Sequence, residues 1–315
     1  MHSKNSTCSI LNLRLMLPNS GLLIEAPLAI VKRPALGQKR LLTLPNTCKD
    51  NGRSSPGAIV KNMVSEQQLA QFEEEGYLLL SGLIPKESVT KAEKAMWQMM
   101  GMDAEDPGSW GQFKRPHLAG FYMEKMGDGK RIELYGVTHP DVLACCTPDY
   151  RAVLKQLASR YPEIPHCESQ QPDGIWALNQ FPVSTEWKSP SPHLDGDFRD
   201  FRLDPGTFRA TSLTYLTDVN SHGGTTVIWP EGPQQIREFR KKNPDFSNHV
   251  GDMKAQFPEM DLGEPMEIVA KQGDVLFFHH LLPHSGTMNV GSSARFAIRY
   301  MCLCLSCRKW EKKGE

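Results

Sequence analysis

The sequence lacks an excess of charge of either sign. Its 315 residues include 36 Lys and Arg and 36 Asp and Glu, so the formal net charge at pH 7 is zero. Nucleic-acid or membrane-surface binding that depends on bulk electrostatics is therefore not expected. Long apolar runs are missing as well, since none approaches the roughly 20 residues that a transmembrane helix needs. The composition thus favours neither a nucleic-acid partner nor a membrane partner.

Internal repeats and a secretory signal peptide are also missing. Without such a signal, the eight cysteines are expected to be reduced thiols in a cytoplasmic protein. The C-terminal spacing "CLCLSC" could indicate a thiolate metal site. We prefer a packing role, because Cys302 and Cys304 lie on an apolar strand where free cysteine behaves as a small hydrophobe.

Residues 1–62 differ from the rest of the chain. They hold nine Lys or Arg but only two acids, Glu25 and Asp50, and they show no sustained periodicity. We interpret them as a disordered extension; a transit peptide is the alternative, and it would make the protein mitochondrial. Residues 63–315 are expected to form one domain, in a monomer or a homodimer.

The pattern of elements predicts helices first and strands later. Ser65 and Gln68 form a capping box for a helix that stops near Gly76, and a strand, "YLLL", follows. Further helices are expected over roughly 86–100, after Thr147-Pro148, and in "EGPQQIREFRKKNPDF". From residue 174 onward, short apolar runs separated by turn residues predict a β-sandwich or barrel.

A metal site is indicated by "SPHLDGDFRDF", which begins at residue 191. If this stretch is a strand, His193 and Asp195 point to the same face and offer an imidazole nitrogen and a carboxylate oxygen. The third ligand must come from elsewhere, and the candidates are His279, His280 and His284. We prefer His284, because it follows Pro283 at a strand edge where a side chain can turn into a cavity.

Two histidines and one carboxylate form the facial triad of non-haem Fe(II) oxygenases, which leaves three metal positions open. A cosubstrate with two carboxylates also needs a cation for its far end. Arg295 and Arg299 lie on one face of "ARFAIRYMC", and a buried guanidinium needs an anion that it can bind bidentately. Of these two arginines, we expect Arg295 to be the anion clamp.

These features resemble the phytanoyl-CoA dioxygenase family of Fe(II)/2-oxoglutarate oxygenases. The shared features are H-x-D at His193 and Asp195, His284 followed by Asn289, and an arginine at 295. The opening "FEEEGYLLLSGLIPKE" and the stretch "GGTTVIWPEG" are similar as well, so the resemblance covers about residues 65–305. It implies a double-stranded β-helix, or jelly roll, with helices packed outside.

The resemblance also implies the reaction and its participants. Fe(II), 2-oxoglutarate and O2 would act together, and a small-molecule substrate would be hydroxylated with release of succinate and CO2. Other residues weighed for the site are polar or aromatic: Gln180, Thr214 and Thr225 for the cosubstrate, Trp110, Lys114 and Arg115 for the substrate, and Asp197 as a competitor of Asp195. The alternatives are a non-catalytic jelly-roll binding protein and a metal-dependent cupin-type enzyme that does not use 2-oxoglutarate.

Overall fold

The structure is a computed structural model that describes residues 64–110, 125–126, 131–159, 175–196, 201–204 and 208–303. The chain divides into two units, Met1–Gly57 and Ala58–Glu315, and every described residue lies in the second unit. No helix among the described residues is both long enough and apolar enough to cross a bilayer.

Six α-helices and two 3-10 turns lie within the described ranges. They are α1 (Glu66–Glu74), α2 (Lys86–Met100), η1 (Pro107–Ser109), α3 (Pro140–Leu143), α4 (Pro148–Ser159), α5 (Gly232–Lys242), α6 (Val250–Lys254) and η2 (Phe257–Glu259).

The described strands are mostly short and form two sheets. They are β1 (Tyr77–Leu80), β2 (Lys125–Met126), β3 (Arg131–Val137), β4 (Ile175–Gln180), β5 (Phe208–Tyr215), β6 (Thr226–Ile228), β7 (Met266–Ile268), β8 (Val275–Phe278), β9 (His284–Gly286) and β10 (Arg295–Leu303).

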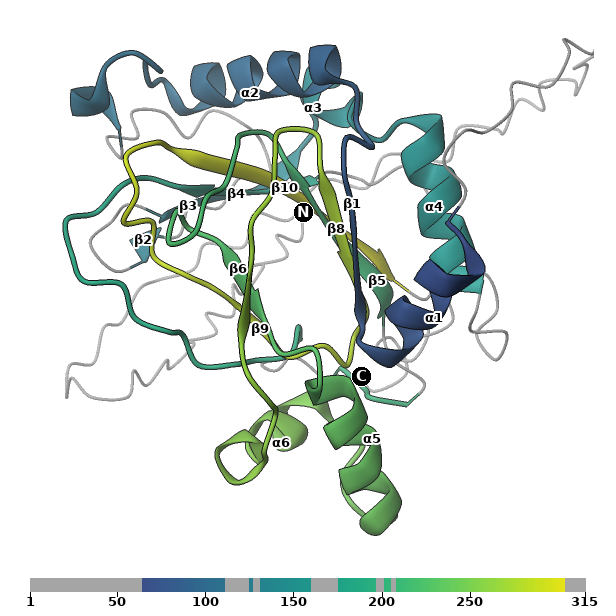
Figure 1. The fold of residues 1–315 in the computed structure, drawn as a ribbon. Helices are drawn as coiled ribbons and strands as arrows, with labels where there is room; N and C mark the ends of the chain where they lie inside the picture. The colour runs from purple at the N-terminus through teal and green to yellow at the C-terminus, as the bar shows by residue number, and fades with distance from the viewer. Residues whose placement is uncertain are drawn as a thin grey trace, which may run out of the picture. The chain divides into compact units, whose positions relative to one another are not determined.

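Both sheets are antiparallel throughout. The major sheet has the order β1-β8-β5-β10-β4-β3-β2, and the minor sheet has the order β7-β6-β9. In Figure 1, β6 and β9 lie across the middle of the view from β1 and β8, with α2 at the top and α4 at the right. The arrangement confirms the expected jelly roll with helices packed outside.

The first elements begin and end where the sequence predicts. Ser65 caps α1 through a capping box with Gln68, and Gly76, at φ +82°, turns the chain into β1. Helix α2 covers the expected residues 86–100 and ends at Gly101, which has φ +66°. These signals are local, which is why the sequence alone locates the elements.

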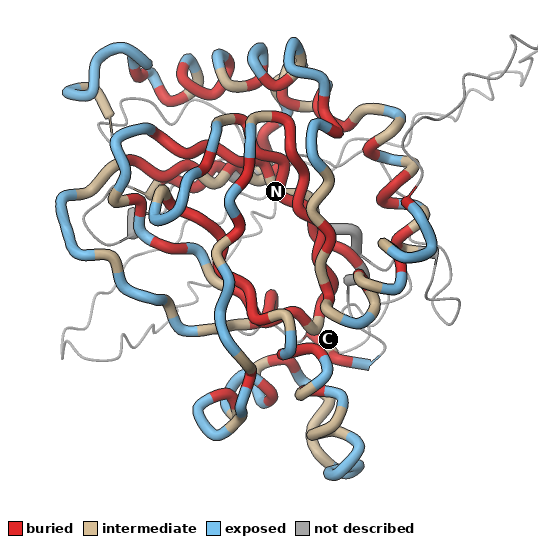
Figure 2. Tube along the Cα trace, in the orientation of Figure 1, coloured by how far each residue is buried: buried red, intermediate tan, exposed pale blue. Residues whose placement is uncertain are grey.

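The two faces of β10 pack against different cores. Phe296 and Ile298 point toward the helices, where Phe296 lies 4.5 Å from Trp97 of α2 between ring centroids. Ala297 points the other way, into a cluster that contains Tyr215 of β5 and residues of the minor sheet. In Figure 2 the central strands are red along most of their length, because both faces are covered. Arg295 and Arg299 share the inner face with Ala297.

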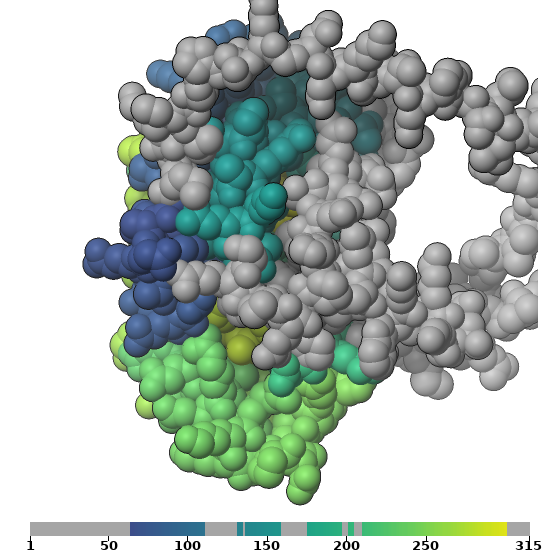
Figure 3. Space-filling view, turned by 90° about the vertical axis from the view of Figure 1, so that its right-hand side faces the viewer, coloured from purple at the N-terminus to yellow at the C-terminus, as the bar shows by residue number. Residues whose placement is uncertain are grey.

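A third apolar cluster lies around α5 and α6 and includes Leu194 and Phe201, on both sides of Asp195. Helix α5 also contacts α1, because Arg237 donates hydrogen bonds to the carbonyl oxygens of Glu73 and Glu74. Figure 3 shows α1 in purple directly above the green residues of this region. The turn that carries Asp195 is therefore anchored by apolar packing on both of its sides.

Candidate metal centre and cosubstrate pocket

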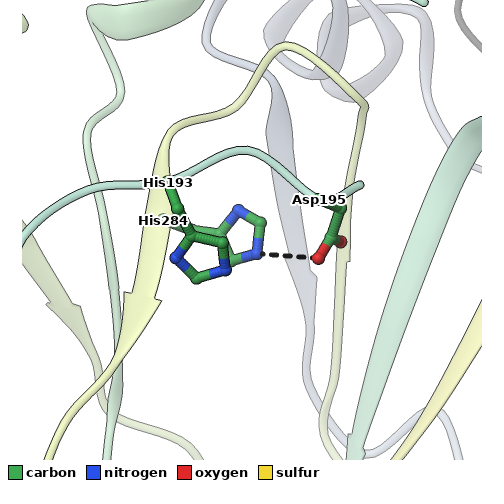
Figure 4. Close-up of side chains that lie close together, drawn as sticks. All are labelled: His193, Asp195 and His284. Atoms are coloured by element: carbon green, nitrogen blue, oxygen red, sulfur yellow. Dashed lines mark ion pairs between the residues drawn. The ribbon is translucent and has the colours of Figure 1, made fainter. Parts of the chain in front are cut away.

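The two histidines of the predicted triad are joined through their backbones. His193 and His284 form an isolated antiparallel bridge, in which each amide N–H donates to the other residue's carbonyl oxygen at 3.0 Å. Their rings lie close together, with centroids 4.5 Å apart and planes tilted by 48° to each other. The pairing places both imidazoles side by side at the start of β9, as Figure 4 shows.

The His284 ring has a defined tautomer. Its Nδ1 lies 2.9 Å from the carbonyl oxygen of Leu282, which can only accept a hydrogen bond, so Nδ1 carries the proton. In the neutral ring, Nε2 then has a free lone pair, and this atom lies 3.5 Å from Oδ1 of Asp195. A backbone carbonyl on the distal nitrogen is the usual support for a metal-ligating histidine.

Asp195 reaches the histidines from a turn and not from a strand. Only His193 of the segment is bridged to another strand, and Asp195 and Gly196 form the turn that follows. Gly196 has φ +85°, and a Cβ there would lie 2.0 Å from the Phe201 ring, so only glycine fits. The sequence argument based on strand alternation therefore predicted the right neighbours for the wrong reason.

The surroundings of Asp195 favour its charged form. Its burial alone would raise the pKa, but the charge of Arg299, together with His284 and His193 whenever these rings are protonated, outweighs this and holds the pKa well below its ordinary value. Arg299 forms an ion pair with Oδ2, the carboxylate oxygen that does not face His284. An ionised carboxylate beside two imidazoles is a set of hard and borderline donors that suits Fe(II).

The geometry of the three groups fits one metal ion. One ligand atom from each of His193, Asp195 and His284 lies within 4.8 Å of the others. Two atoms that each lie about 2.1 Å from an ion can be at most about 4.2 Å apart. The 3.5 Å between His284 and Asp195 is inside that limit, and shifts of a few tenths of an ångström bring atoms 4.8 Å apart to it. Among the described residues, no other group of three His, Cys, Asp or Glu side chains is close enough to hold an ion.

The other two candidate histidines, His279 and His280, directly follow β8, which ends at Phe278. His279 accepts a hydrogen bond from the amide of Leu281, and His280 contacts the carbonyl oxygen of Leu203 at 2.9 Å. Burial lowers the pKa of His279 well below its ordinary value, and the nearby charges of His280 and Arg237 add to this. Both rings thus serve the fold.

Arg295 begins β10 and lies in a row of polar side chains across three strands. Its direct neighbour on β4 is Gln180, whose neighbour on β3 is Arg131. The Arg295 guanidinium donates to the carbonyl oxygen of Leu178 at 3.2 Å and to Oγ1 of Thr226 at 3.4 Å. Its buried Nε has no hydrogen-bond partner among the described residues. This unused donor is suited to bind an anion.

The charge of Arg295 is deeply buried, with 3% of the residue exposed. Burial lowers the pKa of its guanidinium, with the charge of Arg131 acting in the same direction, although arginine remains charged at neutral pH. The Tyr215 ring lies 5.6 Å from its Cζ. Burial raises the pKa of Tyr215, so this phenol stays neutral and can donate to an anion.

Gln180 reaches into the same space between two glycines. A Cβ on Gly224 would lie 2.2 Å from Oε1 of Gln180, and a Cβ on Gly286 would lie 3.5 Å from its Nε2. Gly224 also has φ +76°. Oε1 is buried and has no hydrogen-bond partner among the described residues. The two glycines therefore make room for the amide of Gln180 on the inner face of the sheet.

Two expected cosubstrate residues lie elsewhere. Thr214 alternates with Leu213 and Tyr215, so it points to the helix-covered side of β5. Thr225 bonds to Glu267 at 2.5 Å and to Thr287 at 3.2 Å, away from Arg295. The interior positions belong to Thr226 and Tyr215, which the sequence argument missed.

The predicted substrate residues are only partly described. Trp110 packs on Trp97 and Phe181 in the helix-side cluster, and its indole N–H donates to the carbonyl oxygen of Asp103 at 2.8 Å. Its ring therefore lies on the other side of the major sheet from the triad. Lys114, Arg115 and Asp197 lie outside the described residues.

Comparisons with known proteins agree with this geometry. The family described as phytanoyl-CoA dioxygenase (PhyH) matches residues 72–297. The solved structure of SnoK, a non-haem alpha-ketoglutarate-dependent carbocyclase from nogalamycin biosynthesis, is 17% identical, with a TM-score of 0.50, and the match covers 76% of this chain and 84% of SnoK. At this identity the likeness shows a shared fold.

Two further solved structures give lower scores. EvdO2 from Micromonospora carbonacea var. aurantiaca is 13% identical over 77% of this chain and 92% of its own, with a TM-score of 0.48. The epimerase SnoN, in complex with Fe3+, alpha-ketoglutarate and nogalamycin RO, is 14% identical over 75% of this chain and 82% of its own, with a TM-score of 0.46. No curated protein matches the chain.

Proposed function

This chain belongs to the phytanoyl-CoA dioxygenase family and is a 2-oxoglutarate-dependent non-haem iron dioxygenase, and we propose that His193, Asp195 and His284 hold its Fe(II). The observation that carries the assignment of ligands is that these side chains, which come from two segments far apart in the chain, lie within 4.8 Å of one another. When bound, iron supplies the dioxygen chemistry that oxidises 2-oxoglutarate to succinate and CO2 and hydroxylates the substrate.

We propose that the inner end of β10 binds the far carboxylate of 2-oxoglutarate. Arg295 supplies the charge, Thr226 and Tyr215 supply hydroxyl groups beside it, and Gln180 supplies an amide. His284 and Thr226 lie on the paired strands β9 and β6. In their register, His284 pairs with Ile228, and Thr226 pairs with Gly286. One molecule can therefore lie along the interior with its two ends at the arginine and at the triad.

Other residues orient the metal ligands and exclude water from them. The carbonyl oxygen of Leu282 keeps the proton of His284 on Nδ1, so that the lone pair of Nε2 stays available to bind a metal. Phe278 packs 4.7 Å from the same ring, between centroids, and helps to keep water from it. Because the interior around the triad is apolar and buried, electrostatic interactions there are stronger than in water.

The substrate is proposed to be a small molecule. The complexes of SnoN with nogalamycin RO and of HygX with hygromycin B are of this kind by description, and they illustrate the class without identifying the compound. We also propose that residues 63–315 form the catalytic domain.

An anaerobic titration tests the proposal. Fe(II) and then 2-oxoglutarate are added, and the weak visible charge-transfer band of the chelate is recorded. We expect the band in the native protein and in His249→Ala, an exposed histidine, and its loss in His193→Ala. Metal binding without the band, and without succinate release, would indicate a cupin-type enzyme of another kind. Absence of metal binding would indicate a non-catalytic jelly roll.

Succinate release measured against a panel of metabolites then addresses the substrate. Substrate-stimulated release that disappears in His193→Ala would identify a compound that the enzyme hydroxylates. Release that no compound stimulates would contradict the choice of panel but leave the metal assignment intact, because the band reports on the chelate alone.

A further inference from the structure

A second arginine lies beside the triad. Arg299 shares the inner face of β10 with Arg295 and is four residues further along, a distance of roughly 13 Å in a strand. Its guanidinium pairs with Oδ2 of Asp195, and the exposed fractions of the two side chains are 13% and 6%. Neither the clamp for the cosubstrate nor the set of three ligands uses this cation.

The position of Arg299 is fixed by its neighbour on β4. Trp176 is its direct partner in the register, and the Cζ of Arg299 lies 4.9 Å from the centroid of the indole ring. A guanidinium that stacks on an indole has its plane set by the ring, which a flexible ammonium group would not achieve. The cation is thus held in one place before any ligand binds.

As a consequence, the two carboxylate oxygens of Asp195 have different partners. Oδ1 faces Nε2 of His284 at 3.5 Å, and Oδ2 faces Arg299. The backbone is also fixed there, because Leu194 is fully buried on one side and Gly196 packs against Phe201 on the other. The carboxylate therefore cannot rotate both oxygens toward the histidines while Arg299 remains in place.

We propose that Arg299 is a positioning residue that makes Asp195 a ligand through one oxygen only. The inference rests on the proposed iron site. Carboxylates bind metals through one or two oxygens. With one oxygen, three of six octahedral positions stay open, which is what a chelating oxo-acid and dioxygen require. With two oxygens, Asp195 would occupy one of those positions and compete with the cosubstrate.

The test uses Arg299→Gln, which removes the cation, and Arg299→Lys, which keeps the charge without the planar fork. Arg240→Gln is the matched control, since Arg240 lies on α5 with a distant ion pair to Asp204 at 3.9 Å. Co(II) is bound first, and the intensity of its visible absorption reports the coordination number. 2-Oxoglutarate is then titrated into the metal-loaded proteins.

We expect Arg299→Gln to bind Co(II) as tightly as the native protein does. It should bind 2-oxoglutarate roughly 10- to 100-fold more weakly, a loss as large as that in metal affinity or activity when a partner of a metal ligand is removed. Its Co(II) spectrum should differ from the native one before the cosubstrate is added. Arg299→Lys should recover only part of the loss, and Arg240→Gln should match the native protein.

Three results overturn the proposal. One is a native spectrum and native 2-oxoglutarate affinity in Arg299→Gln. Another is full recovery in Arg299→Lys, which would assign a purely electrostatic role. The third is an equal loss of Co(II) and 2-oxoglutarate binding in both variants, which would assign a role in holding the site together. Failure of the native protein to bind Co(II) would refute the iron site itself, so the two failures are distinguishable.

Discussion

Replacement of Arg295 by lysine is expected to weaken 2-oxoglutarate binding without weakening metal binding. In the native protein the guanidinium is already held by the carbonyl oxygen of Leu178 and the hydroxyl of Thr226, and its Nε remains unused. A carboxylate can then accept two hydrogen bonds from a preset fork. Lysine keeps the charge but presents a point donor, so one of those two bonds is lost.

The magnitude follows from the value of that bond. A hydrogen bond to a charged group contributes about 1.5–3 kcal/mol. Its loss corresponds to a rise in the Kd of 2-oxoglutarate of roughly 10- to 150-fold. Arg295→Gln loses both bonds and the charge, so we expect a loss of at least about a hundredfold. Arg295 contacts Thr226, which pairs with Gly286 of β9, and the metal ligand His284 lies two residues before Gly286. The contacts of His284 should therefore be unchanged.

Thermal unfolding under anaerobic conditions with Mn(II) measures this without turnover. At a 2-oxoglutarate concentration of about 100 times the native Kd, the ligand adds about 2.7 kcal/mol to the free energy of unfolding of the native protein. For a domain of this size that raises the Tm by about 5–10 °C. A Kd about 30-fold weaker leaves about 0.9 kcal/mol, or about 2–3 °C.

Two results would refute the reasoning. If Arg295→Lys shows the native Kd and the native thermal shift, Arg295 is not the clamp. If Arg295→Gln loses Mn(II) binding as strongly as it loses 2-oxoglutarate binding, the arginine supports the metal site and the pocket is misassigned. Arg240→Lys is the matched control, and its Kd and thermal shift should equal the native values.

Other predictions concern the glycine beside Gln180, the pH dependence of the free energy of unfolding, and a buried thiol. Gly224→Ala should weaken 2-oxoglutarate binding because its Cβ would meet Gln180, whereas Gly82→Ala, also at positive φ but in open space, should only lower stability; equal affinities in titrations of both would contradict this. Burial keeps the pKa of His279 well below 6.5, so the unfolded chain takes up a proton that the folded chain does not, and the free energy of unfolding should fall below pH 6.5 by up to about 1.4 kcal/mol per unit. Urea unfolding at a series of pH values should show that the free energy of unfolding of His279→Asn falls less steeply with pH than that of the native protein. An unchanged pH dependence would contradict the role of His279. Burial raises the pKa of Cys145 to about 12, so iodoacetamide should modify it only after denaturation, as peptide mass spectrometry would show.

Local signals predicted much of the fold. The capping box at Ser65, the turn at Gly76 and the limits of α2 depend on residues within a few positions of one another, and the structure has them where they were expected. The choice of His284 over His279 also followed from local signals, since the proline and the small polar residues around it mark a chain that changes direction.

The residues of each strand that point inward could not be predicted from local signals in the same way. In "TSLTYLTDV" and "GGTTVIWP", threonines stand on both faces, and a shift of one position decides which of them points inward. Thr225 and Thr226 illustrate this, because only the second lies beside Arg295. No signal within either strand distinguishes the two threonines, whereas the register of β6 with β9 does.

The register of β10 shows how the site and the fold constrain each other. Arg295 and Arg299 alternate with Phe296 and Ile298, so a slip of one residue would place two guanidinium groups in the helix-side apolar cluster. Each buried cation without a partner costs several kcal/mol, far more than one misplaced apolar side chain. In the observed register, Arg299 meets the carboxylate of Asp195, and Arg295 faces the pocket. The charges that prepare the site for iron and cosubstrate thus also select a single pairing of the central strand.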